Sequence, residues 1–359
     1  MRILIFSLAY HPFVGGAEVA IKEITDRTPD VEFDLVTVNL DGQQKQQERL
    51  GKVNVHRVGQ GKASKYFFPW QGFKVARELH SKNKYDAIWA MMANQAGLAA
   101  LKFKQKFPDV KYLLTLQEGD SELDIMVRTW FMRPLYKAIY RRADQIQAIS
   151  NFLAQRAKNL GAKCPIAVVP NGVVFPAQST EYQKNRRVVT VSRLVKKNGI
   201  ADLIKAMKFV SGQLVIVGSG RLKPSLESLT KQFNLTDRVE FIGSVDNQKV
   251  YQYLSRSNIF VRPSLSEGLG SAFLEAMAMK VPVIATPVGG IPDFLEDERT
   301  GWFCQVNNPK SIAEKINYIL NPENAETVGR VVDAAYQMVK EKYQWEGIAA
   351  KMKGIFQSL

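Results

Sequence analysis

Residues 259–275 read IFVRPSLSEGLGSAFLE and contain the change of pattern that predicts the fold. The stretch begins with the apolar run Ile259–Val261, passes through a loop with two glycines, and continues as a mostly apolar helix pattern. A short β-branched run followed by a turn and a helix is part of a βαβ unit, and repeated units predict a parallel α/β sheet. The same alternation recurs along the chain, with predicted strands at Ile3–Leu8, Phe33–Asn39, Val53–Val58, Ala87–Ala90, Tyr112–Leu116, Gln145–Ser150, Ile166–Val169, Val188–Ser192, Leu214–Gly218, Val239–Ile242, Ile259–Val261, Val281–Ala285 and Trp302–Val306.

The alternation falls into two series, separated by the polar stretch Pro176–Arg187, which has no apolar periodicity and is the predicted linker. We therefore expect two doubly wound α/β domains. The first covers residues 1–175 and the second residues 186–340. A helix over about 343–359 exceeds what the second series needs, and we expect it to cross back onto the first domain.

Composition excludes several classes of protein. The 359 residues are 46% hydrophobic and 23% charged, as in ordinary globular domains. Two cysteines cannot form a disulfide framework, and three histidines argue against a His-rich metal site. No apolar run approaches the roughly 18 residues of a membrane span, and the apolar N-terminal stretch is too short for a signal peptide. We expect a cytoplasmic protein.

The positive charge is concentrated in one region. The net charge is +15, while residues 51–200 hold 26 Lys or Arg and 9 Asp or Glu, a net +17. Such an excess predicts an acidic partner. Residues 62–70 and 128–142 interleave aromatics with cations, which makes an anionic membrane surface along residues 62–142 a candidate partner. In the alternative interpretation, the aromatics pack inward and the cations are simply solvated. Nucleic acid would also explain the charge, but no binding module is recognisable, so none is predicted.

Two stretches carry candidate binding residues. Gly15 and Gly16 follow the first strand and open a helix, where backbone N–H groups suit a phosphate, although a tight structural turn has the same pattern. Glu267 lies in a loop after a strand, and Glu275 follows eight positions later among apolar helix residues. Carboxylates at these positions can accept hydrogen bonds from sugar hydroxyls. Otherwise Glu267 would interact with the helix dipole and Glu275 would lie on a solvated face.

These motifs together resemble the retaining GT-B glycosyltransferases of glycosyltransferase family 4, also called glycosyl transferases group 1. The resemblance covers nearly the whole chain. It rests on Gly15-Gly16-Ala17-Glu18, Pro170-Asn171-Gly172-Val173, Ser192-Arg193-Leu194-Val195, the Glu267-x7-Glu275 spacing and Gly289-Gly290-Ile291-Pro292. It implies GT-B architecture, with two Rossmann-like domains and an interdomain cleft for a nucleotide-diphospho-sugar.

The resemblance also implies residue roles. Glu275 would hold the ribose hydroxyls, and Glu267 would contact the sugar, assisted by the backbone of Gly268, Leu269 and Gly270. Arg193, with Lys197 as second cation, would neutralise the departing diphosphate, because fixed cations stabilise charge that develops in the transition state. Arg193, Lys197 and Glu267 are thus the predicted catalytic residues, and Gly15 and Gly16 belong to the predicted donor site.

This chain departs from the family at two positions. Relatives usually have a lysine immediately before the glycine that matches Gly199, where this chain has Asn198. Many relatives also place a histidine near the sugar and acceptor, whereas this chain offers Gln117, Glu118 and Asp120 at the end of the strand Tyr112–Leu116. These three are the predicted acceptor or sugar contacts, with turn-forming polar residues as the alternative.

The resemblance implies retaining, metal-independent transfer from a UDP- or GDP-sugar to a hydroxyl on a lipid-linked or cell-envelope glycan acceptor. No cofactor is expected, because the nucleotide-sugar is a substrate. Glu122 and Asp124 are candidate ligands for a hard cation, but one pair supplies too few oxygens. A nucleotide-sugar sensor without turnover and a nucleotide-sugar hydrolase or epimerase on the same fold are the alternatives. The oligomeric state is left open.

Overall fold

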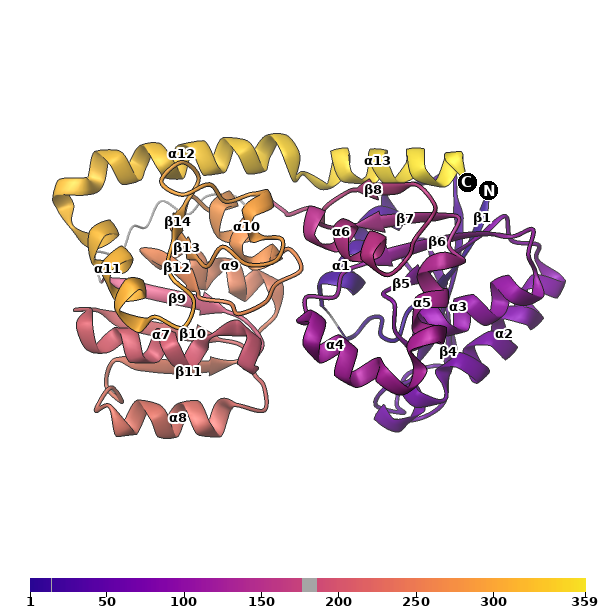
Figure 1. The fold of residues 1–359 in the computed structure, drawn as a ribbon, viewed down its shortest axis with the longest axis horizontal. Helices are drawn as coiled ribbons and strands as arrows, with labels where there is room; N and C mark the ends of the chain where they lie inside the picture. Colours follow the sequence, from indigo (N-terminus) through magenta and orange to yellow (C-terminus); the bar gives the residue numbers. More distant parts are fainter. Residues whose placement is uncertain (14, 176–185) are drawn as a thin grey trace. The chain divides into compact units, whose positions relative to one another are not determined.

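The computed structural model describes residues 1–13, 15–175 and 186–359, so the predicted linker lies outside the described residues except for its last two positions. The chain divides into two compact units. One consists of residues 1–172 together with residues 345–359, and the other of residues 173–344 (Figure 1).

The first unit is built on an eight-stranded sheet in the order β3-β4-β2-β1-β5-β6-β7-β8. Its strands are β1 (Arg2–Phe6), β2 (Glu32–Val38), β3 (Gln47–Leu50), β4 (Val53–Val58), β5 (Ala87–Met91), β6 (Lys111–Leu116), β7 (Gln145–Ala148) and β8 (Ile166–Val168). All neighbours are parallel except β3 and β4, which pair antiparallel. Central strands such as β5, with every residue buried, are apolar on both faces because helices cover both faces of a parallel sheet.

The α-helices of this unit are α1 (Gly16–Asp26), α2 (Phe68–Lys82), α3 (Gln95–Lys106), α4 (Glu122–Thr129), α5 (Arg133–Arg141), α6 (Asn151–Asn159) and α13 (Trp345–Ser358). The C-terminal helix α13 packs against α1, and Trp345 and Phe356 share a buried core with Phe33 and Trp89. An ion pair between Arg27 and Glu346 at 3.1 Å joins the two helices at the surface. The C-terminal segment thus completes the core of the first unit.

Strand β3 has no counterpart among the predicted strands. Its residues, QERL, alternate between exposed and half-buried positions at the edge of the sheet. Periodicity could not reveal this strand, because three of its four side chains are polar and its pairing with β4 rests on backbone hydrogen bonds and an ion pair between Glu48 and Arg57. Each strand that the sequence predicts overlaps an observed one.

The boundary between the units differs slightly from the expected one. Val173 donates its backbone N–H to the carbonyl of Tyr343 at 2.8 Å, and the ring of Phe175 lies edge-on to Tyr336 at 5.9 Å. These contacts assign residues 173–175 to the second unit, so the first unit ends at Gly172 rather than at residue 175. The C-terminal crossover begins at Trp345 instead of about residue 343.

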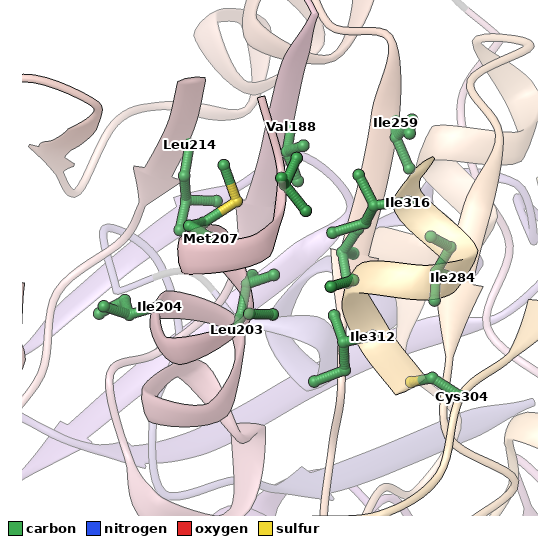
Figure 2. Packing of buried hydrophobic residues seen from close by; sticks show 14 of the residues in the cluster. Val188, Leu203, Ile204, Met207, Leu214, Ile259, Ile284, Cys304, Ile312 and Ile316 are labelled. Atoms are coloured by element: carbon green, nitrogen blue, oxygen red, sulfur yellow. The ribbon is translucent and has the colours of Figure 1, made fainter. Parts of the chain in front are cut away.

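The second unit has a six-stranded parallel sheet in the order β11-β10-β9-β12-β13-β14. Its strands are β9 (Arg187–Val191), β10 (Gln213–Val217), β11 (Val239–Gly243), β12 (Ile259–Arg262), β13 (Val283–Ala285) and β14 (Trp302–Phe303), and its α-helices are α7 (Ile200–Ala206), α8 (Lys223–Gln232), α9 (Asn247–Ser255), α10 (Ser271–Ala278), α11 (Pro309–Leu320) and α12 (Ala325–Lys342). Figure 2 shows the core in which Leu203 of α7 and Ile312 and Ile316 of α11 pack on the sheet. The core therefore fixes the positions of the strands, and the loops that follow the strands begin at their carboxyl ends.

The strand order of the second unit decides where those loops meet. From β9 the chain first adds β10 and β11 on one side, and later β12, β13 and β14 on the other. The direction reverses between β9 and β12, which pair directly. Loops that leave the carboxyl ends of two such strands diverge around a crevice, where open α/β sheets bind their ligands.

A glycine fixes the loop after β12, and its substitution gives a first prediction. Gly289 has φ 59°, and a Cβ atom there would lie 1.9 Å from the carbonyl oxygen of Glu267. Gly289→Ala should lower the free energy of unfolding by more than about 1 kcal/mol, because the residue can neither adopt this conformation easily nor avoid the backbone. Gly329→Ala in α12, where nothing lies within 4 Å, is the matched control and should be neutral or stabilising. Thermal and denaturant unfolding measure both, and equal stabilities for the two variants would contradict this packing.

Candidate functional site

Backbone contacts hold together the loops that follow β9 and β12. The N–H of Leu265 donates to the carbonyl of Lys197 at 2.6 Å. Gly199 has φ 68°, and a Cβ atom there would lie 1.8 Å from the carbonyl oxygen of Pro263, so only glycine permits this approach. The structure therefore brings the predicted cation loop, residues 193–199, beside the predicted carboxylate loop, residues 263–270.

Asn198 has a structural role in this loop. Its side chain is buried and donates from Nδ2 to the carbonyl oxygen of Arg193 at 2.7 Å. This bond shapes the turn in front of Gly199. The Arg193 side chain is exposed and that of Lys197 half-buried. Asn198, at the position where relatives usually have a lysine, thus stabilises the backbone turn in this chain. The neighbouring Lys197 carries a positive charge.

Glu267 is held by a buried partner that the sequence analysis missed. Arg262, the last residue of β12, pairs with Glu267 across 2.5 Å between Nη2 and Oε2, and the guanidinium lies over the ring of Phe273 at 4.3 Å. The other carboxylate oxygen accepts the N–H of Gly268 at 3.0 Å. Charge-assisted bonds of this kind are stronger than neutral ones and fix the rotamer of the carboxylate. The available signal was a single arginine at the end of an otherwise apolar strand, IFVR.

The glycine-rich turn makes room for this ion pair. A Cβ atom at Gly270, which has φ 90°, would lie 2.6 Å from the Phe273 ring and 2.7 Å from Nη2 of Arg262. Leu269 is buried, as is Gly268. The geometry thus gives Gly270 a packing role, and the contact of this turn's backbone with a ligand stays a prediction.

Glu275 differs from Glu267 in that its carboxylate has no hydrogen-bond partner among the described residues. It lies on α10 between Leu274 and Ala276, both buried, and is itself half-buried. Within the described part of the chain, no hydrogen bond reaches its carboxylate. Burial raises the pKa of Glu275 to about 7, although the positive charge of Arg262 acts in the opposite direction. A desolvated acid without a partner costs stability, which is typical of a group that binds a ligand.

In the first unit, an amide pair lies beside the start of α1. The side chains of Gln117 and Asn171 exchange two hydrogen bonds, of 3.2 and 3.1 Å. A Cβ atom at Gly16 would lie within 3.6 Å of the Asn171 amide nitrogen and 3.9 Å of the Gln117 oxygen. Gly15 and Gly16 are exposed, and Gly15 precedes the helix in an extended conformation. The structure thus places Gln117 near the predicted glycine motif, whose neighbour Val14 lies outside the described residues.

The two predicted carboxylates after β6 are engaged differently. Glu118 accepts backbone N–H groups from Ala93 and, at 3.2 Å, from Gln117, and burial raises its pKa. It therefore ties the ends of β5 and β6 together. Asp120 pairs with Arg128 at 3.0 Å, and its side chain is one-third exposed. Of the two, Asp120 is the one whose carboxylate reaches the surface.

No metal cluster accompanies these residues in the part of the chain that is described, where no three His, Cys, Asp or Glu side chains gather closely enough to hold an ion. Asp124 instead accepts the hydroxyl of Ser121 at 2.7 Å at the start of α4. Metal independence stays a prediction. The described helices also include none that is long and apolar enough to cross a bilayer.

Solved structures share the fold. Sucrose-phosphate synthase from Thermosynechococcus elongatus superposes with a TM-score of 0.88 at 21% identity, covering 99% of this chain and 98% of that one. The Anabaena protein HepE, solved with UDP and glucose, has a TM-score of 0.81 at 19% identity and full coverage of both chains. Both likenesses establish the architecture of two parallel-sheet α/β domains.

Sequence comparison identifies the family. An uncharacterized glycosyltransferase from Methanocaldococcus jannaschii is 25% identical over 100% of this chain and 99% of its own length. A GDP-mannose-dependent phosphatidylinositol monomannoside mannosyltransferase from Mycobacterium tuberculosis is 26% identical over 77% of both chains. The family description "Glycosyltransferase Family 4" matches residues 14–174, and "Glycosyl transferases group 1" matches residues 174–338. Together they cover both units, and the chain therefore belongs to the GT-B glycosyltransferases of family 4, group 1.

Proposed function

We propose that this glycosyltransferase transfers a hexosyl group from a UDP- or GDP-sugar to a hydroxyl acceptor with retention of anomeric configuration. The observation that carries the proposal is the pair of loops at the crevice of the second sheet, where the Arg193 and Lys197 loop is bonded to the Glu267 loop. Both nucleotides stay in the proposal, because HepE was solved with UDP while the mycobacterial relative is GDP-mannose-dependent.

Each residue of the crevice has a proposed task. Arg193 and Lys197 neutralise the diphosphate as its bond to the anomeric carbon breaks. Glu267, fixed by Arg262, accepts hydrogen bonds from sugar hydroxyls, and Glu275 accepts those of the ribose. The acceptor oxygen bonds to the anomeric carbon on the face that the diphosphate leaves, and its proton passes to a leaving phosphate oxygen. In this scheme no side chain acts as a nucleophile.

The acceptor is proposed to be lipid-linked or part of a cell-envelope glycan. In support, the mycobacterial relative is a phosphatidylinositol monomannoside mannosyltransferase, and 20 of the 26 Lys or Arg of residues 51–200 lie in the first unit. Gln117 and Asp120 are the proposed contacts for the acceptor or the transferred sugar. Contact with an anionic membrane, the candidate partner along residues 62–142, belongs to the same proposal.

Substitution of the cations tests sugar transfer directly. Arg193→Ala and Lys197→Ala should each lower kcat/KM by about 10- to 150-fold, the value of one charge-assisted contact. Lys196→Ala is the matched control, because this neighbouring lysine is exposed and has no assigned role. The assay measures release of UDP or GDP with and without acceptor, and the anomeric configuration of the product. Release that is independent of acceptor would favour the hydrolase, and binding without turnover would favour the sensor.

Glu275→Gln should stabilise the fold while weakening nucleotide binding. The pKa of Glu275 is about 7 in the folded chain, above its ordinary value of 4.5, so the carboxyl holds its proton more tightly in the folded than in the unfolded state. This preference stabilises the fold below about pH 4.5 and is lost as the pH rises to 7. Above pH 7 the free energy of unfolding of the variant should therefore be higher than that of the parent protein, by on the order of 1–3 kcal/mol.

Nucleotide affinity of the same variant at pH 8 should fall about 10- to 150-fold. Glu240→Gln, at an exposed strand position, controls for loss of a surface charge. Unfolding curves from pH 4 to 9 and calorimetric titration with UDP or GDP provide the readouts. A variant less stable than the parent at pH 8 would show that Glu275 has a structural role instead.

Treatment with EDTA should leave the transfer rate unchanged, because the proposed charge stabilisation comes from Arg193 and Lys197. Rates are compared before chelation, after it, and after addition of Mg²⁺ or Mn²⁺. Loss of activity with recovery on metal addition would contradict this prediction and redirect attention to Glu122 and Asp124.

A further inference from the structure

A cavity of about 240 Å³ lies in the first unit, with walls from α4, α5 and α6. Its lining is partly apolar, through Leu123, Met126 and Leu160, and partly charged, through Arg133, Arg156 and Glu122. None of the predicted donor or acceptor residues lines it. The cavity thus combines hydrocarbon contact with two positive charges, a combination suited to an amphipathic anion.

Arg156 supplies the strongest polar signal in this cavity. The residue is 3% exposed, and its two terminal nitrogens donate to the carbonyls of Glu118 and Asp120 at 3.0 and 2.8 Å. Its Nε is buried without a hydrogen bond, and the nearest carboxylate oxygen, on Glu122, lies 4.0 Å away. A buried charged donor without a partner is costly, so an acceptor oxygen placed there would be favourable.

Glu122 does not block an anion from this position. Its side chain is 62% exposed, and at 4.0 Å it holds Arg156 through charge alone. An exposed carboxylate can turn toward solvent at little cost, since exposed pairs contribute little. With Glu122 turned away, Arg156 and Arg133 leave the cavity with a net positive charge.

The surface next to the cavity is unusually apolar. Leu123, Val127, Trp130 and Phe131 are each about 70% exposed along α4 and the 3₁₀ turn Trp130–Met132 that follows it. Soluble proteins seldom expose several large apolar side chains together, and such patches mark contact sites. Arg128 and Arg133 balance Glu122 and Asp124 along this segment, so the patch suits a lipid surface through its apolar side chains.

We propose that the cavity binds the phosphate group of a phosphate-bearing lipid, with Arg156 Nε and Arg133 as its donors and the hydrocarbon lying along Leu123 and Met126. This inference deepens the membrane contact of the proposed function and rests on that part of it, not on sugar transfer. The exposed aromatics beside the cavity enter the lipid surface while the phosphate is held. The site thus makes the membrane contact selective for lipids whose head group carries a phosphate.

The test measures binding of monomeric n-octyl phosphate. Inorganic phosphate and n-octyl glucoside are the partial probes, because the first lacks the hydrocarbon chain and the second lacks the phosphate group. Trp130 reports binding by its fluorescence in a Trp70→Phe background, since Trp70 is the other exposed tryptophan among the described residues. Octyl phosphate should bind saturably with one molecule per chain, at least tenfold more tightly than either partial probe. Arg133→Gln should weaken it at least tenfold, whereas Arg142→Gln, a matched exposed arginine outside the cavity, should not.

Further variants and a vesicle assay complete the test. Leu123→Ser should weaken octyl phosphate at least threefold, and Arg156→Lys, if it melts like the parent, should weaken it tenfold. Sedimentation should be strong with vesicles containing phosphatidic acid at low salt and weak with phosphatidylcholine alone. UDP and GDP binding should be unchanged in Arg133→Gln, which separates this site from the donor site.

Several outcomes would overturn the proposal. Inorganic phosphate binding as tightly as octyl phosphate would mark a site for a free anion. Octyl glucoside binding equally well would mark an apolar surface without head-group recognition. An equal loss of octyl phosphate affinity in Arg133→Gln and Arg142→Gln would show that binding depends on overall charge and not on this cavity. Absence of saturable binding would show that there is no such site.

Discussion

The buried guanidinium of Arg262 is the group on which the crevice of the second unit depends. It pairs with Glu267, lies over Phe273 of α10, and donates to the carbonyl of Val191 at the end of β9 at 3.3 Å. One side chain therefore links two strands, a loop and a helix. Such a charge can be buried only with its partner in place, because removing either member leaves the other without compensation.

The glycines around this ion pair follow from the same constraint. Gly270 leaves room for Arg262 and Phe273, while Gly199 and Gly289 let backbone carbonyls approach within distances that a side chain would prevent. Against this rigid frame, Glu275 is the exception, since it is half-buried among apolar neighbours with its charge opposed by desolvation. A buried carboxylate without a hydrogen bond costs stability, and such costs concentrate where a ligand binds.

The first unit uses its polar groups in a different way. At the end of β6, Glu118 and Gln117 are bonded to neighbouring loops and to Asn171, and Arg156 holds the backbone of the same segment. These bonds face the interior of the unit. Outside these bonds lies α4, where large apolar side chains such as Leu123 and Val127 are exposed beside charged residues of both signs.

The sequence by itself determined the alternation of strands and helices, the two series of βαβ units, and the anomaly of a glutamate among apolar helix residues. These features are local, because strand and helix periodicity and the burial cost of a charge can be recognised in short windows. Short motifs in order along the chain were enough to identify the family, although each alone is weak.

Only the tertiary structure decided the partners. That Arg262 meets Glu267, that Asn198 braces Arg193, that Glu118 is bonded to Ala93, and that residues 173–175 join the second unit depend on which segments distant along the chain lie together. Strand β3 belongs to the same class, because backbone pairing at a sheet edge leaves no apolar pattern in its four residues. Local patterns fix what a segment can form, and long-range packing fixes what each polar side chain must bond to.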